Sequence, residues 1–174
     1  QRSEAPLQPD EQVEFSITDT VNLGDPIALY GAPHLKEIDL SSMVQHISTI
    51  SVAGVYSDDL GTKLEKLIIG SDINHNTTIL EISSIKNARA LKHLDVSYLQ
   101  ALKGLDLSEN FYLEELHASG TSIANITFAK GAPLSKMYLP RTFKTLHLTS
   151  LPALSFSGIY HELFPLVESI KIVD

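Results

Sequence analysis

A six-residue apolar pattern recurs along the second half of the chain and restricts its fold more than any other feature of the sequence. Each copy has apolar residues, often leucine, at its first, fourth and sixth positions, as in Leu91–Val96. The copies begin at residues 91, 102, 113, 123, 134 and 143, in steps of nine to eleven residues, and another begins at 167. Two steps make about 21 residues, a length typical of one coil in a repeat protein. The pattern therefore predicts a solenoid whose coils each contain two short strands.

The spacing within a copy predicts how these strands pack. Side chains alternate between the two faces of a strand, so the fourth and sixth residues should point inward and the fifth should point to solvent. We expect the copies at 91, 113 and 134 to stack into one sheet, and those at 102, 123, 143 and 167 to stack into another. Stacking would join the inward residues into one apolar column. The residues expected to be buried are Leu94, Val96, Leu105, Leu107, Leu116, Ile126, Phe128, Met137, Leu139, Leu146 and Leu148.

The first half of the chain contains looser copies of the same pattern. They begin at residues 35, 47 and 64, with a weaker copy at 79. The insertions Ala53–Lys63 and Gly70–Thr78 are rich in Gly, Asp, Asn and Ser, which is typical of loops. We therefore predict a linker or extended arm over residues 1–12 and one solenoid domain over 13–174. Its repeats should be loose over 35–90 and regular over 91–174.

Two further structural expectations concern the segments between strands and the last copy of the pattern. Short helical turns between strands are expected near Ser84–Ala90 and near Ile159–Phe164.

The copy at Val167–Ile172 is the last one, and no polar capping segment follows it. Since the end of a solenoid exposes a strand edge unless it is capped, we expect this strand to form an open edge of a longer solenoid. Ile170 and Ile172 would then lie beside Leu146 and Leu148.

Two stretches of the sequence resemble known repeat families. Residues Leu102–Leu116 read LKGLDLSENFYLEEL and resemble the short leucine-rich repeats of bacterial surface proteins such as internalins. That resemblance implies that Asn110 lies inside a turn and hydrogen-bonds to the backbone of neighbouring coils. Residues Gly120–Pro152 read GTSIANITFAKGAPLSKMYLPRTFKTLHLTSLP and are similar to repeat segments in large virion and tail proteins of phages that infect gut bacteria, as is KLEKLIIGS at 63–71. Neither family supplies a catalytic residue.

The fold class that follows is a leucine-rich-repeat solenoid. It should be mostly β, with two short strands in each coil of about 21 residues and few short helical turns. The fold alone does not determine a function, because a repeat scaffold can carry many kinds of site.

Composition excludes several classes of function. The formal net charge is −8, and no run of Lys or Arg is present, so a nucleic-acid partner and binding to an anionic membrane surface are not expected. The chain has no cysteine, which excludes disulfides, thiolate metal sites and cysteine nucleophiles. No apolar run approaches the roughly 20 residues of a transmembrane helix, so we expect no membrane insertion.

The seven histidines raise the question of metal binding or catalysis. His117 and His147 both occupy the outward fifth position of the pattern, but on opposite predicted sheets. His93 belongs to the coil next to His117, at a different position along its strand. Metal sites require side chains that converge. On this basis we predict no metal site, no catalytic residue and no bound cofactor.

Outward positions on the two predicted sheets form the candidate partner-binding face. On the first sheet they are Asp95, His117 and Tyr138, and on the second they include Thr127 and His147. Solenoids usually bind partners through such faces, and aromatic residues are enriched among the residues that dominate binding energy. Tyr138 is the aromatic residue that the pattern places outward. The alternative interpretation is that these residues form a solvated ladder on the surface, which contributes little to stability.

The sequence thus predicts a non-catalytic repeat module of a larger extracellular or phage virion protein, which binds a protein or a glycan. One alternative is a structural spacer or assembly element of a particle, contacted only by neighbouring domains or subunits. Another is a secreted repeat protein of the bacterial cell surface. An enzyme that uses the inserted loops is a further alternative, and a recessed cluster of polar groups would favour it.

Overall fold

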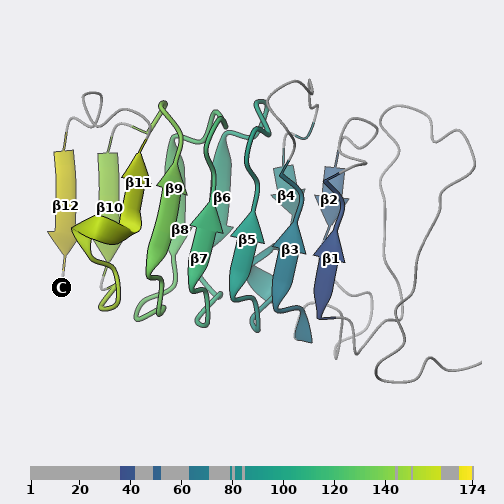
Figure 1. Cartoon of the computed structure of the whole chain (residues 1–174), viewed down its shortest axis with the longest axis horizontal. Coiled ribbons are helices and arrows are strands. Elements are labelled where there is room, and N and C mark those ends of the chain that lie inside the picture. Colours follow the sequence, from purple (N-terminus) through teal and green to yellow (C-terminus); the bar gives the residue numbers. More distant parts are fainter. Residues whose placement is uncertain are drawn as a thin grey trace, which may run out of the picture.

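The computed structural model describes residues 36–41, 49–51, 63–70, 79, 81–83, 85–143, 145–149, 151–161 and 169–173, with only the backbone for the strands at 49–51, 145–149 and 169–173 and for Glu81, Ser83, Phe156 and His161. This part of the chain consists mostly of short strands in parallel sheets. Helix is almost absent from it, with single 3-10 turns at η2 (Ile85–Asn87) and η3 (Phe156–Gly158). Consecutive strands run in opposite directions and form two rows (Figure 1). The linker expected over residues 1–12 lies outside the described residues.

The odd-numbered strands form one six-stranded parallel sheet. Its strands, in spatial order, are β1 (Glu37–Asp39), β3 (Lys66–Ile68), β5 (His93–Asp95), β7 (Glu115–His117), β9 (Lys136–Leu139) and β11 (Ile159–His161). Leu94, Leu116 and Met137 occupy matching positions on three adjacent strands. The prediction that the copies at 91, 113 and 134 stack into one sheet is therefore confirmed.

The even-numbered strands lie behind this sheet in Figure 1 and form three hydrogen-bonded pairs. The pairs are β2 (Thr49–Ser51) with β4 (Glu81–Ser83), β6 (Gly104–Leu107) with β8 (Asn125–Phe128), and β10 (Thr145–Thr149) with β12 (Ser169–Val173). Neighbouring pairs are in contact, β4 with β6 and β8 with β10. Among the described residues no backbone ladder joins β6, β8, β10 and β12 into the single sheet predicted for the copies at 102, 123, 143 and 167. The expected pairing of Ile170 with Leu146 and of Ile172 with Leu148 is confirmed for the backbone.

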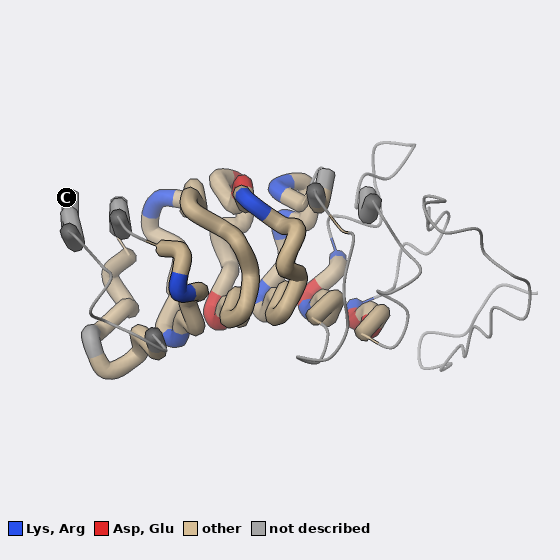
Figure 2. Tube along the Cα trace, turned by 90° about the horizontal axis from the view of Figure 1, so that it is seen from above, with Lys and Arg blue, Asp and Glu red and all other residues tan. Residues whose placement is uncertain are grey.

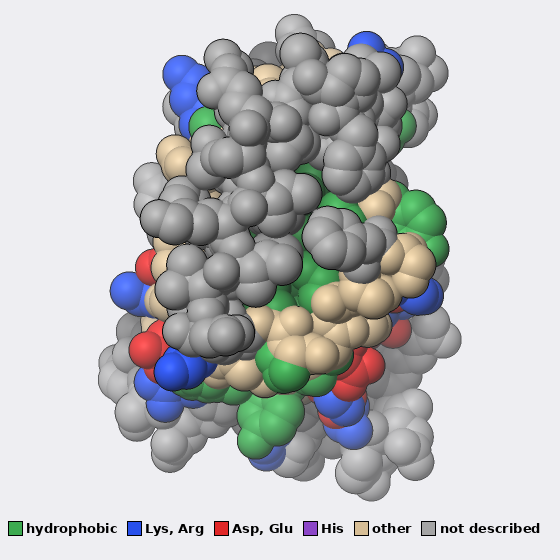
Figure 3. Space-filling model, turned by 90° about the vertical axis from the view of Figure 1, so that its left-hand side faces the viewer, with side chains coloured by type: hydrophobic (Ala, Val, Ile, Leu, Met, Phe, Trp, Pro, Cys, Tyr) green, Lys and Arg blue, Asp and Glu red, His purple; other side chains and the backbone are tan. Residues whose placement is uncertain are grey.

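The apolar core lies between the two rows of strands. Leu94, Leu116 and Met137 are completely buried there, as the pattern predicts. In the view from the β12 end, hydrophobic side chains of described residues are visible in the interior, and charged side chains lie toward the margins (Figure 3). Ile126 differs from its prediction because it is only partly buried. Its strand β8 has a backbone ladder with β6 and none with β10, so one side of Ile126 is less closely covered.

The two predicted helical turns have different outcomes. The turn expected near Ser84–Ala90 is present as η2. The turn expected near Ile159–Phe164 is wrong over its first three residues, which form strand β11 and pair with β9. Since β11 begins at the pattern spacing from β9, the strand continues the sheet. His161 stands where the pattern usually has an apolar residue, and this hid the copy in the sequence.

Asn110 lies in the turn between β6 and β7 and is completely buried. Its side-chain Nδ2 donates hydrogen bonds to the carbonyl oxygens of Ile85 at 3.1 Å and Ala88 at 2.8 Å, both in the preceding connection between β4 and β5. The backbone hydrogen bonds implied by the resemblance to leucine-rich repeats are therefore present. Because this side chain belongs to one connection and donates to two carbonyl groups of the preceding one, it ties two successive connections together.

Gly120 favours glycine for two reasons, its backbone conformation and a close neighbouring ring. Its φ is +70°, a conformation that L side chains rarely adopt, and a Cβ at this residue would overlap the ring of Tyr98. Gly131 has a similar φ of +79°, but nothing lies within 4 Å of where its Cβ would be. The two glycines thus share a backbone constraint and differ in the space available.

We expect Gly120→Ala to lower the free energy of unfolding by about 1–3 kcal/mol, from left-handed backbone strain together with displacement of Tyr98. Gly131→Ala should show the backbone effect alone and cost less. Urea unfolding of both variants measures the difference. An equal loss in the two variants would mean that the Tyr98 ring moves aside freely.

Candidate functional site

The exposed surface of the six-stranded sheet, which we call the odd-strand face, carries two columns of outward side chains. The parallel register aligns the first residues of β1, β3, β5, β7 and β9 in column one, which runs Glu37, Lys66, His93, Glu115, Lys136. The third residues of the same strands form column two, which runs Asp39, Ile68, Asp95, His117, Tyr138 and continues with Tyr160, the middle residue of β11. The residues between the two columns point into the core. The site is thus built by repetition, because each strand from β1 to β9 contributes one residue to each column.

Charges alternate in sign across neighbouring strands at the β1–β5 end of this face. Lys66 pairs with Glu37 of the adjacent strand, and Glu65 lies between Lys92 at 2.8 Å and Lys36 at 3.4 Å. The hydrogen bond and the charge of Lys92 lower the pKa of Glu65, and Glu65 in turn raises the pKa of Lys92. These groups are exposed, so the pairs contribute little to stability. Figure 2 shows basic and acidic residues interspersed along the described chain.

Column two ends in a stack of rings. The rings of His117 and Tyr138 have centroids 4.2 Å apart and are inclined at 27°, and those of Tyr138 and Tyr160 are 4.6 Å apart at 11°. Adjacent strands lie about 4.8 Å apart, so rings at the same register position come into stacking distance without any other adjustment. Tyr138 therefore has both faces covered, while Tyr160 is 47% exposed.

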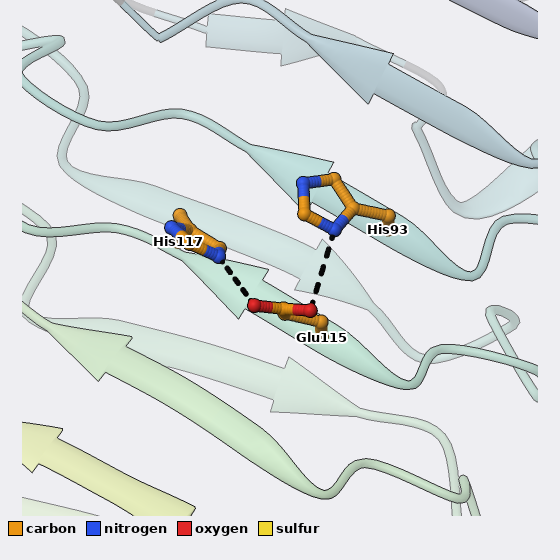
Figure 4. Close-up of side chains that lie close together, drawn as sticks. All are labelled: His93, Glu115 and His117. Carbon is orange, nitrogen blue, oxygen red and sulfur yellow. Dashed lines mark hydrogen bonds and ion pairs between the residues drawn. The ribbon is translucent and has the colours of Figure 1, made fainter.

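His93 and Glu115 of column one and His117 of column two form a compact cluster on β5 and β7 (Figure 4). Nε2 of His117 lies 2.7 Å from Oε1 of Glu115, and Nδ1 of His93 lies 3.7 Å from Oε2 of the same carboxylate. The two imidazole rings have centroids 5.2 Å apart. One ligand atom from each residue can be chosen so that all three lie within 4.8 Å of one another.

The environment of the cluster shifts two of its groups. Burial lowers the pKa of His93, and this effect outweighs the opposing charges of Glu115 and Asp95. Burial of Glu115 alone would raise the pKa of this carboxyl, but the hydrogen bond from His117 and the nearby positive charges lower it. His93 is therefore expected to be neutral, and Glu115 ionised, near neutral pH.

The structure brings together three of the five residues proposed for partner binding. Asp95, His117 and Tyr138 occupy successive positions of column two, as predicted. Thr127 lies exposed on β8, and the backbone of His147 belongs to β10, so these two residues are in the other row of strands. They are not part of the odd-strand face.

The sequence reasoning missed three contributors to this face. His93 was set apart because it does not share a register position with His117, yet the two rings approach each other across β5 and β7. The prediction that the histidines do not converge is therefore wrong for this pair, because diagonal neighbours on adjacent strands lie within reach of long side chains. Glu115 occupies the register position of His93 and shares a face with His117. The exposed aromatic Tyr160 is a candidate contact residue from the sequence, but its place on this face was missed together with β11, although its distance from Tyr138 in the sequence matches the repeat.

Comparisons of the chain with protein-family models, with curated proteins and with solved structures found no match. In the described part of the chain, no helix is long and apolar enough to span a membrane.

Proposed function

We propose that this chain is a leucine-rich-repeat solenoid that acts as a non-catalytic binding module and recognises a protein ligand through the odd-strand face. The observation that carries the proposal is the ring stack of His117, Tyr138 and Tyr160 on an otherwise charged, regular surface. Aromatic rings held in place before binding lose little entropy when a partner covers them. Alternating charges beside them provide complementary partners for a protein surface and help to fix its orientation.

The geometry favours a protein ligand over a glycan. Glycan binding through aromatic residues needs an open ring face, and both faces of Tyr138 are covered by its neighbours. Tyr138, at the centre of the stack, instead presents its edge and its phenol hydroxyl group, which suit side chains and backbone of a protein.

The wider context is also part of the proposal. The resemblance of Leu102–Leu116 and Gly120–Pro152 to repeats of bacterial surface and phage virion proteins supports a module of a larger extracellular or virion protein. Asn110 supports the leucine-rich-repeat assignment, because it joins successive connections in the way that the resemblance implies. A spacer without a ligand is the rival hypothesis, and it predicts no role for the exposed rings.

Selection from a displayed peptide library tests the proposal. Peptides selected on the full chain are expected to bind the Tyr138→Ala/Tyr160→Ala double variant about 10- to 100-fold more weakly, which corresponds to a combined loss of about 1.4–2.8 kcal/mol from two residues that dominate the interface. Phe111→Ala/Tyr112→Ala is the matched control. These aromatics are 45% and 61% exposed but lie in the turn between β6 and β7.

Peptides that bind both double variants as well as the wild-type chain would contradict the proposal. The same proteins on a glycan array provide the second arm. Glycan binding that disappears in Tyr138→Ala/Tyr160→Ala would replace the protein ligand with a carbohydrate, and the proposed ligand class would then be wrong.

A further inference from the structure

The cluster on β5 and β7 has an arrangement that a surface ladder does not require. Four outward positions form a two-by-two block, in which His93 is opposite Glu115 and Asp95 is opposite His117. The imidazoles occupy one diagonal of this block and the carboxylates occupy the other. Figure 4 shows Glu115 between the two histidine rings, with one carboxylate oxygen directed to each.

We propose that His93, Glu115 and His117 form a binding site for a divalent first-row transition ion of the zinc class. Two imidazoles and one carboxylate are a ligand set that proteins use for zinc and for iron(II). In tetrahedral zinc, ligand atoms with bonds of about 2.0–2.2 Å lie roughly 3.3–3.6 Å from each other. The candidate ligand atoms already lie within 4.8 Å, so side-chain rotations without backbone movement can close the site.

Neighbouring side chains orient one of the histidine ligands and add negative charge beside both. Tyr138 stacks on His117 at 4.2 Å and restricts the orientation of its ring. Fixing a ligand ring before binding is the role of groups that surround a metal site. Asp95 occupies the fourth corner of the block and adds a negative charge beside both histidines. Its Oδ1 accepts a hydrogen bond from the backbone N–H of Ser97 at 2.8 Å, so this carboxylate is held on the sheet.

Positive charge nearby opposes metal binding and limits its expected strength. Lys136 Nζ lies 3.8 Å from Oε2 of Glu115, and Lys66 is the register neighbour of His93 on β3. The ion must also displace the hydrogen bond between His117 and Glu115. The three ligands leave further coordination positions open toward solvent. We therefore expect reversible binding rather than a permanently occupied structural site. The site goes beyond the proposed protein binding, and it is tested without a partner.

Titration of the metal-free full chain with zinc chloride, followed by calorimetry, tests the site directly. The expected result is one equivalent of Zn²⁺ per chain, with binding weakened about tenfold or more in each of His93→Gln, Glu115→Gln and His117→Gln. Mg²⁺ and Ca²⁺ should not compete, because they prefer sites made of oxygen atoms. Cobalt(II) should give visible absorption bands that these three variants lose.

His147→Asn is the matched control, because it removes a histidine from the other row of strands, on β10. It should bind Zn²⁺ like the wild-type chain. Lys136→Gln should tighten binding by about twofold, since it removes a positive charge beside Glu115. Thermal unfolding checks that each variant is folded.

Zn²⁺ binding absent at millimolar concentration would overturn the site, and so would binding that His93→Gln, Glu115→Gln and His117→Gln leave unchanged. Neither result would touch the peptide-binding test, because Tyr138 and Tyr160 are not ligands.

Discussion

Leu116→Ala is expected to lower the free energy of unfolding by about 2–5 kcal/mol, as truncation of a fully buried leucine does. Leu116 has no exposed surface and occupies the middle of β7, between Leu94 on β5 and Met137 on β9. Strands on both sides hold the backbone, so the structure has little freedom to collapse into the space left behind. Chemical denaturation followed by far-ultraviolet circular dichroism measures the loss.

Two variants delimit the cause of this effect. Leu116→Met conserves most of the volume and should cost less than about 1.5 kcal/mol. Tyr112→Ala removes a larger side chain that is 61% exposed and should change stability by no more than about 0.5 kcal/mol. If Leu116→Ala costs no more than Tyr112→Ala, the core is not continuous at β7.

Asn110→Asp is expected to be about as severe, at about 3–5 kcal/mol near neutral pH, because it leaves a buried charge without compensation. The substitution keeps the shape of the side chain but replaces the two N–H donors with an oxygen acceptor. That oxygen would face the carbonyl oxygens of Ile85 and Ala88. The repulsion should weaken the attachment of the β6–β7 turn to the segment that contains η2.

The pH dependence of this variant identifies the mechanism. The folded state disfavours the charged carboxylate, so its penalty is present at neutral pH. The charge contribution should be lost as the pH falls below about 4, where the group is protonated in the unfolded state as well. Asn125→Asp makes the same change at an exposed position of β8 and should be nearly neutral. A penalty for Asn110→Asp that is the same at pH 3 and pH 7 would contradict a charge effect.

The strand positions could be predicted from the sequence because the apolar pattern is a direct consequence of burial. Leu94, Leu116 and Met137 must all avoid water, so their spacing records which strands lie side by side. The strand at Ile159–His161 was hidden because its last position has a histidine. The pairing of the even-numbered strands into separate ladders was also not predictable, because hydrogen-bond geometry between strands leaves no trace in hydrophobicity.

The candidate site was predictable only in part, for a related reason. Column two follows from register alone, which is why Asp95, His117 and Tyr138 were placed together correctly. The approach of His93 to His117 depends on how two long side chains lean across a diagonal. Spacing along the chain fixes the positions of their Cα atoms but does not fix that lean.

The regular register has an evolutionary consequence. Core residues at matching positions are separated by 22 residues from Leu94 to Leu116, by 21 from there to Met137, and by 22 from there to Ile159. Duplication or loss of a gene segment of this length would insert or remove one strand from each row and leave the remaining contacts in register. The odd-strand face can therefore grow or shrink by whole strands within a lineage, each of which adds or removes one residue in each column. Insertion or deletion of one residue within a strand would instead turn the core side chains of that strand outward.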